Sequence, residues 1–170
     1  MNTLLPIAKR NAVLSRMATL LEEERTNLKS VNQQDLDNYS GADLAMEKRL
    51  LVADAKIDGM ILSMQQLASQ EEPIGVERFH FVHEKGMKIT NKTAAFGTVM
   101  IIYESRPDVT VEAGGIAFKS GNKILLKGGK ESLLSNLKIV ALWHQALKKN
   151  EISEDWVEYL NFNRSETQAF

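Results

Sequence analysis

Apolar residues recur at helical spacing through the first part of the chain, up to about residue 70. One stripe consists of Leu14, Met17, Leu21 and Leu28. A second stripe consists of Ile57, Met60, Ile61, Met64, Leu67 and Ala68. The polar stretch between them, residues 32–41, predicts a short helix and a turn. Because such stripes usually pack against each other rather than line a cofactor site, we predict a helical region over residues 1–72.

The next segment, residues 73–96, has a different pattern. Pro73-Ile74-Gly75 ends the helical periodicity. Two strand-like runs, residues 76–82 and 87–93, flank the turn-forming Glu84-Lys85-Gly86. This pattern predicts a β-hairpin arm.

From Gly97 the pattern predicts a strand followed by a helix. Residues 99–103 form a short apolar run, which is typical of a parallel strand covered on both faces. Pro107 suits the first turn of a helix, and Gly121 suits the position just after its end. The residues that this helix is predicted to bury are Val109, Ala113, Ile116 and Ala117.

A second strand and a second helix follow. Residues 124–126 form the strand, and Glu131 or Ser132 opens the helix. Its predicted apolar stripe consists of Leu133, Leu137 and Val140. Because the segment between the two strands is long enough to hold a helix, we expect parallel strands with a right-handed crossover.

The last residues predict that the sheet is unfinished. Residues 156–162 have the pattern of a third strand, and residues 165–168 have the form of a capping box that begins another helix. A helix cut within its first turn would leave apolar surface exposed, so we expect a truncated α/β fold. The predicted regions are 1–72 (helical), 73–96 (hairpin arm) and 97–170 (the first part of an α/β domain).

Composition narrows the classes of function. The net charge is −1, which gives no overall positive field for nucleic acid or an anionic membrane. We find no apolar run long enough for a transmembrane helix and no signal-peptide pattern at the start, so we expect a cytoplasmic protein. The 170 residues include no cysteine, which excludes a disulfide, a cysteine-ligated zinc ion or a thiolate nucleophile within them.

Two lysines are the best candidates for binding an anion. Lys127 and Lys130 flank Gly128-Gly129 at the predicted end of a parallel strand, just before a helix. Ligands of open α/β sheets bind outside the carboxyl ends of the strands, and two ammonium groups there suit a phosphate or a ribose. The alternative is that both lysines are solvated loop charges.

Ser105 and Arg106 follow the first predicted strand at the same edge of the sheet. The planar guanidinium of Arg106 suits a phosphate or carboxylate of a substrate. The alternative is a structural ion pair, for which the candidate partners are Glu104, Asp108 and Glu112.

Histidines do not indicate a metal site. His80 and His83 are three residues apart on a predicted strand, so their side chains point to opposite faces. His144 is predicted to lie on a helix surface. No metal site is therefore predicted.

Residues 97–136 resemble the signature region of the γ-glutamyl phosphate reductases (glutamate-5-semialdehyde dehydrogenases) in the aldehyde dehydrogenase superfamily. The matching segments are Tyr103-Glu104-Ser105-Arg106-Pro107, Lys119-Ser120-Gly121-Asn122, Gly128-Gly129-Lys130-Glu131 and Ser135-Asn136. Ala95-Phe96-Gly97-Thr98 departs from the Pro-Leu-Gly-Val-like turn of the family.

The resemblance implies an oxidoreductase of proline biosynthesis that reduces γ-glutamyl phosphate to glutamate 5-semialdehyde with NADPH. It implies a Rossmann-like NADPH-binding domain beginning in residues 97–170, and an oligomerisation arm at residues 73–96. A homo-oligomer is expected at full length, with functional coupling to glutamate 5-kinase. The family's nucleophilic cysteine lies in a catalytic domain that these residues do not include, so the chain is expected to be inactive alone.

The resemblance also implies roles for individual residues. Lys127, Gly128, Gly129 and Lys130 would bind the cofactor, and Ser105 and Arg106 the substrate. A lysine at 130, where many NAD-using relatives have an acidic residue, favours NADPH over NADH. One alternative is a non-catalytic oligomerisation or binding module with the same fold. Another is a bifunctional pyrroline-carboxylate synthase, which is disfavoured because no kinase half precedes Met1.

Overall fold

The structure, a computed structural model, describes residues 5–162 and residue 166. The helices are α1 (Ile7–Glu23), α2 (Arg25–Asn38), α3 (Leu44–Leu50), α4 (Asp54–Ser69), α5 (Pro107–Lys119) and α6 (Leu133–Lys149). The strands are β1 (Glu77–Val82), β2 (Lys88–Lys92), β3 (Thr98–Ile102), β4 (Lys123–Lys127) and β5 (Val157–Tyr159). Two short 3-10 helices, η1 (Lys130–Ser132) and η2 (Glu154–Trp156), precede α6 and β5.

Helices α1 to α4 lie within residues 1–72, and the two predicted apolar stripes meet. Leu14 and Met17 of α1 are fully buried, as are Met60 and Met64 of α4, and the two helices lie side by side. Residues 32–41 contain the expected helix followed by a loop, but the helix is not a short separate one, because residues 32–38 are the second half of the longer α2. Asn32 and Asp35 of α2 are buried and hydrogen-bonded, and a search for periodic apolar residues does not detect such polar contacts.

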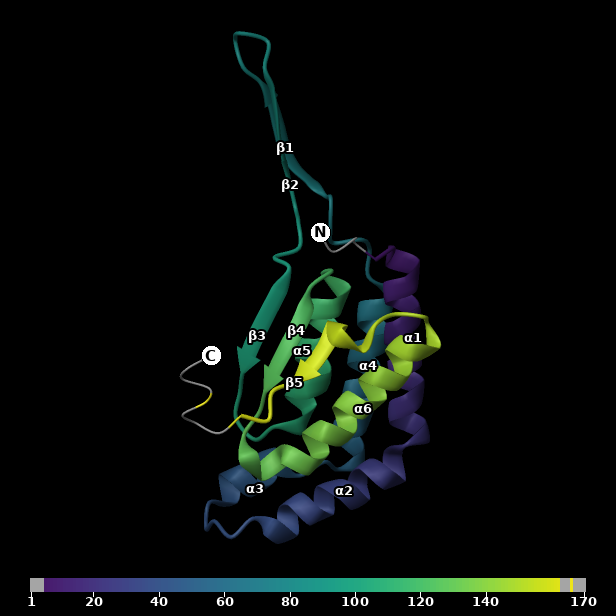
Figure 1. Cartoon of the computed structure of the whole chain (residues 1–170), viewed down its shortest axis with the longest axis vertical. Helices are drawn as coiled ribbons and strands as arrows, with labels where there is room; N and C mark the ends of the chain where they lie inside the picture. Colours follow the sequence, from purple (N-terminus) through teal and green to yellow (C-terminus); the bar gives the residue numbers. More distant parts are fainter. Residues whose placement is uncertain (1–4, 163–165, 167–170) are drawn as a thin grey trace.

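The sheet that follows has the predicted parallel arrangement. Its strand order is β3-β4-β5, with Val99 opposite Ile124 and Ile124 opposite Val157. The third strand is shorter than the predicted residues 156–162, and most of the predicted capping box at 165–168 lies outside the described residues. The α5 and α6 crossovers pack against each other beside this sheet (Figure 1). The predicted α/β fold class is confirmed.

Helix α5 has the predicted ends but not the predicted buried face. Pro107 is its first residue, and Gly121 follows it with a φ of 73°. The Gly121 N–H bonds to the Phe118 carbonyl, and the Asn122 N–H to that of Ala117, which together form a Schellman motif.

Of the four residues predicted to be buried in α5, only Ala117 is. Val109 and Ala113 are half-buried, and Ile116 is 58% exposed. The buried face is instead formed by Val111, Gly114, Gly115 and Phe118. The two glycines explain the difference, since a Cβ on Gly114 would touch the Trp143 ring of α6 and one on Gly115 would overlap Met64 of α4.

The predicted apolar stripe of α6 also differs from the face that the helix buries in the structure. Val140 is buried, but Leu133 is half-buried and Leu137 is 41% exposed. The buried apolar residues of α6 are Ile139, Val140, Leu142, Trp143, Ala146 and Leu147. His144 is not a simple surface residue, because its Nε2 lies 2.8 Å from the Val157 carbonyl oxygen of β5.

A hairpin arm lies within residues 73–96 and projects from the body of the molecule (Figure 1). Strands β1 and β2 pair antiparallel, with His80 opposite Thr90 and Phe81 opposite Ile89. A hydrogen bond from the His83 N–H to the Met87 carbonyl closes the turn. The arm carries exposed apolar side chains, including Phe79 and Phe81.

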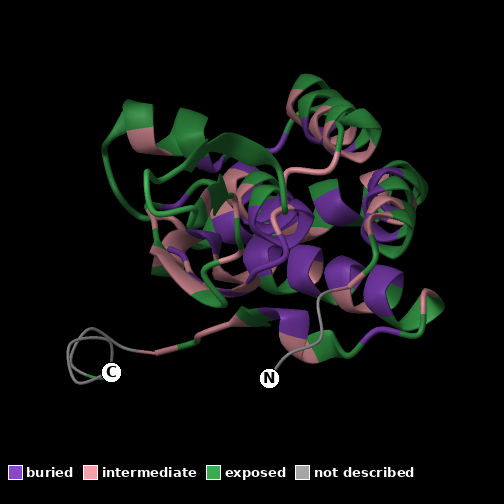
Figure 2. Ribbon diagram, turned by 90° about the horizontal axis from the view of Figure 1, so that it is seen from above, coloured by how far each residue is buried: buried purple, intermediate pink, exposed green. Residues whose placement is uncertain are grey.

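One core joins the helical region to the sheet. Its buried side chains include Leu14 of α1, Phe118 of α5, Ile124 of β4 and Trp143 of α6. Figure 2 shows the buried residues gathered on the inward faces of the helices. Within residues 5–162, no helix is long and apolar enough to cross a membrane.

Candidate functional site

The carboxyl ends of β3 and β4 bring Ser105 together with the Gly128-Gly129-Lys130 turn. Ser105 is buried, and its Oγ donates a 2.5 Å hydrogen bond to Glu131 Oε2. A Cβ on Gly129 would overlap Ser105 Oγ, so the turn needs glycine to approach this closely. The sequence placed these residues at one edge of the sheet, and the structure puts them in contact.

A buried polar network lies under this turn. Tyr103 OH is 2.6 Å from Thr110 Oγ1, which donates to Asn136 Oδ1 at 2.7 Å. Because the single Thr110 hydroxyl hydrogen goes to Asn136, Tyr103 is the donor to Thr110. Asn136 Nδ2 donates in turn to Ser132 Oγ at 2.9 Å and to Tyr159 OH at 3.3 Å. The network therefore connects the carboxyl ends of β3 and β5 to the start of α6.

The two tyrosines of this network remain neutral at physiological pH. Burial raises the pKa of Tyr103 far above its ordinary value. Burial also raises the pKa of Tyr159. Both groups act as fixed hydrogen-bonding supports at neutral pH.

Gly128 packs directly onto this network. A Cβ at this position would overlap Asn136 Nδ2 and would lie 3.1 Å from the ring of Tyr103. The main chain of the turn is therefore pressed onto Asn136, a residue that the sequence offered only as part of a matching segment.

The two candidate lysines differ in their surroundings. Lys127 Nζ is half-buried and donates a 3.0 Å hydrogen bond to the Gly128 carbonyl. Lys130, in η1, is exposed, and its Nζ has no hydrogen-bond or ion-pair partner among the residues that the structure describes. Lys130 is the ammonium group available to an incoming anion.

A cavity of about 570 Å³ adjoins Lys130. It lies between the start of α6 and the loop that joins α2 to α3. Its lining residues are Asp35, Asn38, Tyr39, Ser40, Gly41, Lys130, Glu131, Leu133 and Leu134. The loop was interpreted from sequence as a simple turn, and it contributes one wall of this cavity.

Arg106 makes the ion pair that the sequence left open. Its Nη2 lies 2.8 Å from Asp108 Oδ2, and this contact raises the pKa of Arg106. Lys56 Nζ approaches the other oxygen of Asp108 at 3.8 Å. The Arg106 side chain nevertheless remains half exposed beside the start of α5.

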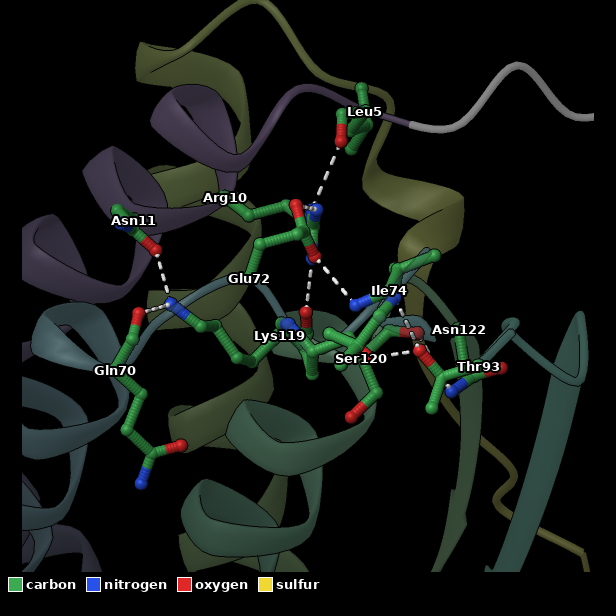
Figure 3. Close-up of polar contacts among 12 residues, drawn as sticks. Leu5, Arg10, Asn11, Gln70, Glu72, Ile74, Thr93, Lys119, Ser120 and Asn122 are labelled. Atoms are coloured by element: carbon green, nitrogen blue, oxygen red, sulfur yellow. Dashed lines mark hydrogen bonds and ion pairs between the residues drawn. The ribbon is translucent and has the colours of Figure 1, made fainter. Parts of the chain in front are cut away.

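The Lys119-Ser120-Gly121-Asn122 segment lies at the opposite, amino-terminal end of the sheet (Figure 3). Arg10 is fully buried there, and its Nε donates a 3.0 Å hydrogen bond to the Leu5 carbonyl. Its other nitrogens bond to the Lys119 carbonyl and to Glu72. Arg10 thus donates to a carbonyl at the end of α5 and forms an ion pair with Glu72, which precedes the arm.

The same cluster fixes the base of the hairpin arm. Lys119 Nζ donates to Asn11 Oδ1 at 2.7 Å and to the Gln70 carbonyl at 2.6 Å. Glu72 Oε1 accepts the Ile74 N–H at 3.0 Å, where the arm begins. Asn122 Oδ1 accepts the Gly97 N–H at 3.0 Å, where it ends. This part of the matching sequence is structural and is remote from Lys130.

Metal binding is not indicated by the described residues, among which no cluster of three or more His, Asp or Glu side chains could hold an ion.

No protein-family model matches the chain.

Individual proteins do match it. A γ-glutamyl phosphate reductase of Aliarcobacter butzleri is 38% identical over 149 residues, which are 86% of this chain and 36% of that protein. The crystal structure of the γ-glutamyl phosphate reductase of Thermotoga maritima superposes with a TM-score of 0.90 at 35% identity. That match covers 97% of this chain and 41% of the Thermotoga chain.

A more distant match shows the fold alone. Succinic semialdehyde dehydrogenase of Streptococcus pyogenes, solved with NADP⁺, has a TM-score of 0.74 at 14% identity over 96% of this chain and 33% of its own. The chain spans between about a third and two fifths of the length of the proteins that it matches. It is therefore related by sequence and fold to the γ-glutamyl phosphate reductases and matches the N-terminal part of the aldehyde dehydrogenase-like fold.

Proposed function

We propose that this chain supplies the first part of the NADPH-binding domain of a γ-glutamyl phosphate reductase, an oxidoreductase of proline biosynthesis. In this proposal residues 1–72 are the supporting helical region, 73–96 an oligomerisation arm and 97–170 the start of the cofactor domain. The observation that carries the proposal is that Lys130, which has no ion-pair partner among the described residues, lies beside a cavity on a glycine turn at the carboxyl end of β4. Its matches to named reductases favour this function over a non-catalytic module.

The residues of the turn suit a phosphorylated dinucleotide. Gly128 and Gly129 let the main chain pack closely against the network and Ser105, which fixes where Lys130 begins. Lys130 would pair with the 2′-phosphate of NADPH, and Lys127 would contribute positive charge nearby. NADPH, when bound, supplies the hydride for reduction of the acyl group.

The substrate would approach from the end of β3. The half-exposed guanidinium of Arg106 offers donors for the phosphate or carboxylate of γ-glutamyl phosphate, while Asp108 holds it in position. Ser105, bonded to Glu131, would act by shaping the turn, and the nucleophilic cysteine would come from outside these 170 residues. A cytoplasmic homo-oligomer coupled to glutamate 5-kinase completes the proposal.

Calorimetric binding of 2′,5′-ADP and 5′-AMP to the folded chain tests the cofactor assignment. We expect 2′,5′-ADP to bind more tightly, and Lys130→Glu to weaken it about tenfold or more while changing 5′-AMP little. Lys85→Glu, the same charge change in the exposed hairpin turn, is the control and should have no effect. Equal binding of the two nucleotides by the folded wild-type chain would overturn the assignment.

A further inference from the structure

A carboxylate from α2 occupies the start of α6, next to the candidate cofactor turn. Asp35 Oδ1 accepts the Leu134 N–H at 3.1 Å, and Oδ2 accepts the Ser135 N–H at 2.8 Å. The same Oδ2 accepts the Ser135 hydroxyl at 2.6 Å. Asp35 is only 4% exposed, although it is about 100 residues away in sequence from the amides that it binds.

A second buried side chain of α2 fixes this arrangement. Asn32 Nδ2 donates to Ser135 Oγ at 3.0 Å and to the Leu50 carbonyl at 3.0 Å, and its Oδ1 accepts the Val52 N–H at 2.7 Å. Since Ser135 Oγ accepts from Asn32, its own hydrogen is free to go to Asp35. Asn32 and Asp35 are three residues apart, which places them on one face of α2.

The position of this carboxylate matters because phosphate commonly binds at the start of such a helix. In open α/β sheets, a helix that follows a strand-end turn offers its first N–H groups and its positive dipole end to phosphate. Here two of those N–H groups are already bonded to a buried negative charge. Asp35 also lines the cavity beside Lys130, so a phosphate in that cavity meets a cation on one wall and an anion on another.

We propose that Asp35 is a built-in anion that excludes phosphate from the start of α6 and directs a phosphorylated ligand to Lys130. It acts as a positioning residue, because it holds the helix that follows Gly128-Gly129-Lys130 and does not contact the ligand itself. The claim that Asp35 excludes phosphate from the start of α6 follows from the geometry of Asp35. The claim that NADPH is directed toward Lys130 rests on the proposed function.

Amide NMR of the full chain during titration with inorganic phosphate tests the exclusion. In the wild type, the Leu134 and Ser135 amides should not shift saturably. In Asp35→Ala they should do so, because the variant frees both N–H groups. Asp37→Ala is the matched control, since Asp37 is exposed on the same helix and, within the described part of the chain, accepts only from Gln33. Saturable shifts at these amides in the wild type, or none in folded Asp35→Ala, would overturn the proposal.

A milder variant keeps the proposal testable if Asp35→Ala does not fold. Asp35→Asn retains the shape of the side chain but loses its charge and one acceptor oxygen. We expect hydrogen exchange at the Leu134 and Ser135 amides to become at least tenfold faster, and Asp37→Asn to leave it unchanged. Unchanged exchange in Asp35→Asn would contradict the proposed role.

A parallel titration with 2′,5′-ADP separates this proposal from the proposed function. Wild-type shifts are expected at Gly129 and Lys130 and not at Leu134 or Ser135. If 2′,5′-ADP shifts no amide while phosphate still binds only to Asp35→Ala, the proposed function fails and the exclusion by Asp35 stands.

Discussion

Ser105 Oγ donates a 2.5 Å hydrogen bond to Glu131 Oε2 and so links the carboxyl end of β3 to the 3-10 turn that follows β4. Burial acts to raise the pKa of Glu131, but the Ser105 hydroxyl, the residue's own N–H and the Lys130 cation together lower it. The side chain is thus an ionised acceptor that holds the turn carrying Lys130.

Glu131→Gln should lower stability in a pH-dependent way. Because the folded-state pKa lies below the ordinary 4.5, the stabilisation is fully present above about pH 4.5 and is lost as the pH falls through the folded-state pKa. We expect a loss of about 1–2 kcal/mol at pH 7, typical of a hydrogen bond to a charged group. Urea unfolding at pH 7 and pH 3 measures it, with exposed Glu71→Gln as control. An equal loss at both pH values would contradict this account.

Gly128→Ala should destabilise the chain by about 1–3 kcal/mol, as overpacking of a buried site does. The added Cβ would overlap Asn136 Nδ2 and crowd the Tyr103 ring. Gly59→Ala is the matched control, because Gly59 lies exposed in α4 with nothing near its missing Cβ, and there alanine should stabilise the helix by up to about 1 kcal/mol. Denaturant unfolding compares the two. A neutral Gly128→Ala would show that the turn is not packed on the network.

Arg10→Met should cost about 3 kcal/mol or more, because it removes the fully buried partner of the Glu72 ion pair and leaves the Leu5 and Lys119 carbonyls without this donor. Arg16→Met, which breaks the partly exposed pair with Glu23 on the same helix, should cost at most about 1 kcal/mol. Unfolding midpoints of the two variants test this difference. Equal effects would mean that the cluster of Figure 3 does not fix the base of the arm.

The fold could be predicted from sequence as far as local signals reach. Pro107 and Gly121 correctly marked the ends of α5, because both act through backbone geometry. The buried face of α5 could not be predicted, because Gly114 and Gly115 add no hydrophobicity and yet are the positions where α6 and α4 come closest. The apolar stripe containing Ile116 therefore looked like the core face, although Ile116 is exposed.

In the candidate site, too, local sequence signals predict some features, while others depend on packing between distant elements. The positions of Lys127 and Lys130 follow from where β4 ends, and that end is a local feature. Asp35 lies in a polar stretch with no motif, and only the packing of α2 against α6 brings it to the Leu134 and Ser135 amides. The spacing of Asn32 and Asp35 was a signal of a shared helix face, but not of what that face contacts.

Complementation tests the central claim most directly. The segment that the chain matches is removed from the Thermotoga maritima reductase, and the remaining part is mixed with the chain. The NADP⁺-dependent oxidation of glutamate 5-semialdehyde in phosphate buffer is then measured. We predict no turnover by either piece alone, turnover on mixing, and a loss of preference for NADP⁺ over NAD⁺ with Lys130→Glu. Turnover by the chain alone, or a co-eluting complex of the two pieces that shows none, would contradict the account.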